Sequence, residues 1–84
     1  MKILIELESD CYTDKQRKYC SDNKIEIEWD LPFLPNRGDS FDCNSIIGKD
    51  KMPDFDKNLY WFINSIEFER INGEIIPILC IGGE

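Results

Sequence analysis

The stretch LYWFINSIEFERINGEIIPILCI, residues 59–81, decides the fold class of this 84-residue chain. Asn72-Gly73 near its middle is a strong signal for a β-hairpin, because a two-residue type I′ turn needs positive φ at both positions. The flanking segments Leu59–Arg70 and Glu74–Ile81 are rich in Ile and aromatic residues, which favour strands. We therefore predict an antiparallel hairpin, with the cross-strand pairs Phe68–Pro77, Ile66–Leu79 and Asn64–Ile81.

Two features of this hairpin predict how it bends. Leu59–Arg70 carries apolar residues on both faces at its start, whereas Glu67 and Glu69 follow on one face only. A strand buried on two sides at one end and on one side at the other is typical of a curled barrel strand. Pro77 has no amide proton, so we expect it at a sheet edge or at a bulge.

Three further segments show the alternation of a strand with one buried face. Lys2–Glu8 places Ile3, Ile5 and Leu7 on one face, and Ser40–Ile47 resumes the pattern through Phe41, Cys43 and Ile47. Lys24–Leu31 gives the clearest pattern. Its expected inward residues are Ile25, Ile27, Trp29 and Leu31, and its outward residues are Glu26, Glu28 and Asp30.

The segments between these strands read as loops. Residues 9–23 are polar, and Thr13-x-x-Gln16 fits a capping box that would allow a short helix over Asp14–Cys20; a long ordered loop is the alternative. Residues 48–58 are charged and interrupted by Pro53. The fold class predicted is therefore all-β or mainly β: a small, partly open five-stranded barrel of Src-homology-like type in one domain, residues 1–84. An oligonucleotide-binding-type barrel is the alternative.

The charge balance limits the kinds of partner. Ten Lys and Arg against seventeen Asp and Glu leave a net charge of −7, which repels phosphate backbones and disfavours nucleic acid. The amino-terminal residues do not form a signal peptide, and no apolar run is long enough for a membrane helix. We expect a cytoplasmic protein, without membrane partner, that is a monomer or a weak homodimer.

The inventory of reactive residues is small. The chain has no His, no nucleophile elbow and no glycine-rich phosphate loop, so we expect neither an enzyme nor a cofactor. The four cysteines lack the short spacing of zinc ligands, and we expect no metal site. Cys43 and Cys80 read as small core residues, whereas Cys11 and Cys20 lie in the first polar loop.

Residues 31–40, LPFLPNRGDS, contain a proline-ligand pattern and an adhesion tetrapeptide. Their context favours a turn, because Pro32 and Pro35 end a strand and Gly38 permits a reversal beside Asn36 and Asp39. We expect Arg37 to be unimportant for the fold.

A resemblance adds to this reading. Trp29-Asp30-Leu31-Pro32, Pro35, Gly38-Asp39 and the aromatic run Tyr60-Trp61-Phe62 resemble small uncharacterised β-barrel proteins of Bacteroides-type bacteria and their phages. The similarity covers residues 24 to about 80. It implies a barrel of this type and carries over no catalytic residue.

The aromatic residues give the best candidate surface. Trp61, Tyr60 and Phe33, with Arg37, are the candidate interaction residues, although for the aromatics a place in the core is the favoured interpretation. The function expected is a protein-interaction or accessory module with an unknown protein partner. The alternative is a single-stranded nucleic-acid-binding barrel that uses Lys15, Arg17 and Lys18.

Overall fold

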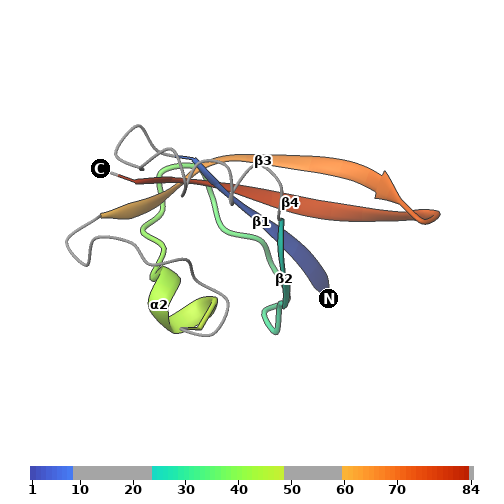
Figure 1. Ribbon diagram of the computed structural model, residues 1–84, viewed down its shortest axis with the longest axis horizontal. Helices are drawn as coiled ribbons and strands as arrows, with labels where there is room; N and C mark the ends of the chain where they lie inside the picture. Colours follow the sequence, from blue (N-terminus) through green and yellow to red (C-terminus); the bar gives the residue numbers. More distant parts are fainter. Residues whose placement is uncertain (9–23, 49–59, 84) are drawn as a thin grey trace.

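The computed structural model describes residues 1–8, 24–48 and 60–83. These residues form the strands β1 (Lys2–Glu8), β2 (Ile25–Glu28), β3 (Trp61–Ile71) and β4 (Glu74–Gly83), and the one-turn helix α2 (Cys43–Ile46). The strands make one mixed sheet in the order β2-β1-β4-β3 (Figure 1). The fold is therefore mainly β, as the sequence predicts.

The β3–β4 hairpin confirms the turn signal. Asn72 and Gly73 have φ of 51° and 84°, the two positive values that the turn needs. The predicted pairs Phe68–Pro77 and Ile66–Leu79 are both present. The predicted pair Asn64–Ile81 is wrong, because a bulge between Ile63 and Ser65 shifts the register and places Ile63 opposite Ile81.

Pro77 lies just before the point at which β4, already paired with β3, begins to pair with β1 as well. The turn makes Ile71 and Glu74 a hydrogen-bonded pair, so alternation places Phe68 and Pro77 in a non-hydrogen-bonded pair. The nitrogen of Pro77 thus faces away from β3, and β1 begins to pair with β4 one residue later, at Ile78. The missing amide proton interrupts neither ladder.

The parallel pairing of β1 with β4 joins the two ends of the described chain. It runs from Leu4 opposite Ile78 to Glu8 opposite Gly82, while β1 pairs antiparallel with β2 on its other side. β4 is consequently a central strand, and its residues Ile76 to Gly82 are all buried. Pairing this central strand along both edges holds the sheet together.

The core lies on the face of the sheet that α2 and residues 29–47 cover (Figure 1). Its buried members are Ile3, Ile5, Leu7, Ile25, Ile27, Trp29, Phe41, Cys43, Ile47, Trp61, Ile63, Leu79 and Ile81. The inward residues predicted for β1 are confirmed. Those of β2 are confirmed except for Leu31, which is 49% exposed because the strand ends at Glu28.

The predicted strand Ser40–Ile47 is wrong beyond its first residues. Asp42 accepts a hydrogen bond from the Ser45 amide at 3.2 Å and caps α2, and a helical turn buries Cys43 and Ile47 on one side. The apolar spacing at four residues fits this helix as well as it fits alternation. Local capping chemistry therefore overrode the strand pattern.

Residues 38–41 nevertheless extend the sheet. The Gly38 amide donates to the Ile63 carbonyl at 2.8 Å, the Ile63 amide to the Asp39 carbonyl at 2.9 Å, and Ser40 bridges Phe62. This pairing is only one bridge long. The described sheet has four strands and is not closed, so the five-stranded barrel and its Src-homology type are not confirmed.

The segment 31–40 contains the predicted turn. The Asn36 amide donates to the Asp39 carboxylate at 2.8 Å, and the Asp39 amide donates to the Asn36 carbonyl at 3.1 Å. Gly38 adopts φ of 91°. These contacts are those expected when Asn, Gly and Asp reverse the chain.

Some predictions lie outside the described residues. They are the helix or loop over 9–23, the loop over 49–58, the roles of Cys11 and Cys20, and the basic residues Lys15, Arg17 and Lys18. Within the described ranges, no helix has the length and apolar content to cross a membrane.

Candidate functional site

Of the four residues singled out from the sequence, one lies in the core and three are exposed. Trp61 is 8% exposed and belongs to the core, whereas Tyr60 and Phe33 are 53% and 63% exposed. The Tyr60 hydroxyl lies 2.8 Å from Ser40 Oγ, and its ring stacks on Phe62. Arg37 is exposed at the turn. No ring contact or hydrogen bond links Phe33 to Tyr60, and an interaction role for these residues stays a prediction.

A different feature stands out at the end of the hairpin. We call residues 65–77, which lie beyond the bulge and around the turn, the hairpin arm. Figure 1 shows the turn of this arm projecting past the other described strands. Among the described strands, β4 within the arm pairs with β3 alone up to Pro77, because its ladder with β1 starts at Ile78.

The arm exposes apolar side chains on the face that continues the core. Ile66 lies opposite Leu79 and still packs against the core, but Phe68 and Ile75 further out are 63% and 61% exposed. Phe68 lies opposite Pro77, and Arg70 lies opposite Ile75, two residues nearer the turn on the same face of the sheet. Phe68 and Ile75 are therefore diagonal neighbours on one face, close enough to act together.

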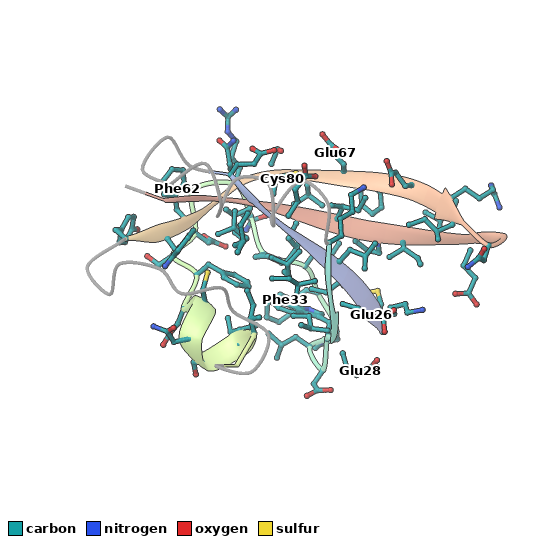
Figure 2. All side chains as sticks on the ribbon, in the orientation of Figure 1. Glu26, Glu28, Phe33, Phe62, Glu67 and Cys80 are labelled. Carbon is teal, nitrogen blue, oxygen red and sulfur yellow. The ribbon has the colours of Figure 1, made fainter. Side chains whose placement is uncertain are left out.

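On the opposite face of the arm, the exposed residues of β3 are acidic, and the residues of β4 that lie opposite them, Ile76 and Ile78, are buried. Glu67 and Glu69 alternate with Phe68, so they project from the other face of β3 (Figure 2 labels Glu67). Lys24 Nζ donates a hydrogen bond to Glu69 Oε2 at 3.2 Å, and the two side chains form an ion pair. Among the residues that the structure describes, no cation pairs with Glu67.

The outer edge of the arm offers backbone hydrogen-bonding groups. Since Ile71 and Glu74 form the hydrogen-bonded pair that closes the turn, Glu69 and Glu67 also bond to β4. The amides and carbonyls of Ile66, Phe68 and Arg70 then point away from β4. Residues 38–41 occupy this edge only as far as Ile63, and no other described segment pairs with it.

A second cluster of polar groups lies on the face away from the core. Side-chain donor atoms of Glu6, Glu8 and Cys80 all lie within 4.8 Å of one another. Burial raises the pKa of the Cys80 thiol, a hydrogen bond with Ser65 opposes this, and the nearby carboxylates raise the pKa further. The thiol therefore stays protonated near neutral pH, which makes it a poor nucleophile.

Sequence reasoning missed the arm as a candidate site. The signal was present in Glu67-Phe68-Glu69, where an apolar residue stands between two acids at strand spacing. Alternation shows that Phe68 shares a face with Ile66, but it does not show where the core ends along that face. Comparison with protein-family models, with curated proteins and with solved structures finds no match for this chain.

Proposed function

We propose that this protein is an interaction module that binds an extended segment of a partner protein as an added strand on the outer edge of the hairpin arm. The observation that carries the proposal is the edge at Ile66, Phe68 and Arg70, with which no other described segment pairs. Unpaired edge amides and carbonyls are a template for another chain, and peptide recognition by strand addition uses them.

The exposed apolar side chains support the proposal that this edge binds a partner rather than remaining exposed to water. Edge strands are commonly protected by charges and by bulges, and β3 has both: Glu67 and Glu69 on one face, Arg70 on the other, and the bulge before Ser65. Between these charges the edge still presents Phe68 beside Ile75, both more than half exposed. A docked strand would cover Phe68, and its backbone would satisfy the outward amides and carbonyls.

The acidic face argues against the nucleic-acid alternative at this site. Phe68 could stack on a base, but Glu67 and Glu69 flank it and would repel phosphate groups. A protein segment has no such penalty, so a protein partner fits the arm better.

Peptide selection combined with amide hydrogen exchange tests the proposal. A random nonapeptide display library is selected on the full chain, and the enriched peptides are added to isotope-labelled protein. The amides of Ile66, Phe68 and Arg70 should exchange more slowly in the complex. The amides of Glu67 and Glu69 should change little, because they already donate to β4.

Phe68→Ser and Phe33→Ser form a matched pair of variants, since both rings are 63% exposed. Phe68→Ser should weaken binding of the selected peptides about 10-fold, as truncation of an aromatic anchor does, and Phe33→Ser should leave it unchanged. Absence of any enriched peptide, or protection centred on residues 31–37, would overturn the proposal.

A further inference from the structure

We infer that the partner segment carries the pattern basic–apolar–basic, and that Lys24 occupies part of its binding position in the free protein. This inference rests on the proposed function and names the partner chemistry for the same edge. It comes from the order of charges along the arm and from Lys24, the cation that contacts the arm among the described residues.

The strand geometry fixes the pattern. Glu67 and Glu69 project from one face of β3, and Phe68 projects from the other face between them. Side chains of a docked strand alternate in the same way, and directly opposite residues share a face. Two partner residues, two positions apart, therefore face the carboxylates, and the residue between them faces Phe68. The pattern reads the same in either direction, so it holds for antiparallel and for parallel docking.

Lys24 shows that the carboxylate face accepts an ammonium group. Its Nζ lies 3.2 Å from Glu69 Oε2, although Lys24 precedes β2 and Glu69 lies on β3. The two side chains are 35% and 48% exposed, so water reaches the pair and weakens it. A partner cation can replace Lys24 at small cost.

A second copy of this chain fits the edge poorly in the registers centred on residues 67 to 69. In a two-fold antiparallel ladder, residues with outward-facing backbone groups must lie opposite one another. Centring the ladder on Phe68 places Glu67 opposite Glu69 of the other copy. Centring it on Glu67 or on Glu69 places that residue opposite itself. Like charges directly opposite are destabilising, and two chains of net charge −7 also repel one another.

A cationic partner has the complementary charge. It would pair with both carboxylates and would be attracted to this acidic chain over a distance. These arguments favour a basic strand from a different protein over a self-assembled dimer.

Two synthetic peptides of equal composition test the pattern. Ser-Val-Lys-Val-Lys-Val-Ser places both lysines on one face of a strand, whereas Ser-Val-Lys-Lys-Val-Val-Ser places them on opposite faces. The first should bind the full chain about 5-fold more tightly, since only it brings both cations to the carboxylates. The Glu67→Gln, Glu69→Gln double variant should lose that preference.

Two variants that each remove one positive charge test the role of Lys24. Lys24→Gln frees Glu69 and should tighten binding of the alternating peptide by about 2- to 3-fold. Lys2→Gln is the control, because Lys2 pairs with Glu26 on β2 at 3.0 Å and feels the charge of Glu74 near the turn, whereas Lys24 pairs with Glu69. Lys2→Gln should have a smaller effect.

The outcomes separate this inference from the proposed function. Equal binding of the two peptides, with the outward arm amides protected, would overturn the basic–apolar–basic pattern and leave edge binding intact. Equal effects of Lys24→Gln and Lys2→Gln would overturn the competition by Lys24. Failure of these peptides and of every selected peptide to protect the edge amides would overturn both proposals.

Discussion

Replacing Gly82 by Ala should destabilise the protein, and the sign of the effect should reverse once Phe62 is also replaced. Gly82 lies in β4 between Glu8 and Phe62 of the neighbouring strands. A Cβ at this position would lie 2.7 Å from Phe62 Cζ and 2.9 Å from Cε2, well inside van der Waals contact. The ring therefore occupies the space that the glycine leaves.

The expected magnitude follows from two opposing effects. Ala in a strand is more stable than Gly by roughly 0.5–1 kcal/mol, because glycine loses more backbone entropy on folding. Forcing a methyl group into filled space costs roughly 1–3 kcal/mol. Phe62 is half-buried and stacks on Tyr60 with ring centroids 6.0 Å apart, so a shift of the ring away from the new methyl group disturbs this stacking. We expect a net loss of about 1 kcal/mol in the free energy of unfolding.

Urea denaturation of a double-mutant cycle measures this coupling. Gly82→Ala, Phe62→Ala, the double variant and the unmodified protein are followed by Trp fluorescence. In the Phe62→Ala background, Gly82→Ala should stabilise by about 0.5–1 kcal/mol, because the clash is gone and the entropy gain remains. An equal cost of Gly82→Ala in both backgrounds would refute the reasoning.

Two further predictions concern backbone strain and a buried thiol. Gly38→Val should lower the free energy of unfolding by about 1–2 kcal/mol, because a φ of 91° is strained for any residue with a side chain, even where the surrounding space is open. Arg37→Ala should change the free energy of unfolding little. Thermal denaturation of both variants checks this. Burial, and then the charge of Asp42, raise the pKa of Cys43 to about 12 from 9.0, so this group's contribution to stability is complete below pH 9 and declines as the pH rises from 9 toward 12. Denaturation midpoints at pH 8 and pH 11 should show that decline, and a Cys43→Ala variant with the same slope would contradict it.

The sequence by itself determined the local features of the fold. Asn72-Gly73 fixed the turn and, with it, the register of the residues nearest the turn. Alternation gave the buried residues of β1 and most of those of β2. These predictions succeeded because each depends on backbone preferences and on side-chain period within a few residues.

The tertiary structure decided where the pairing changes and where the core ends. The parallel pairing of β1 with β4 joins residues far apart in the chain, and no local pattern specifies it. The bulge between Ile63 and Ser65 also interrupts regular alternation, next to the point where residues 38–41 bond to Ile63 on the other edge of β3. The helix at Cys43 is different, because its cap Asp42 is local in the sequence. Phe68 and Ile66 look equivalent in the sequence. One is exposed and the other packs on the core, because the covering residues 29–47 reach only part of the hairpin. That limit of coverage, set by packing, makes the arm a candidate binding site.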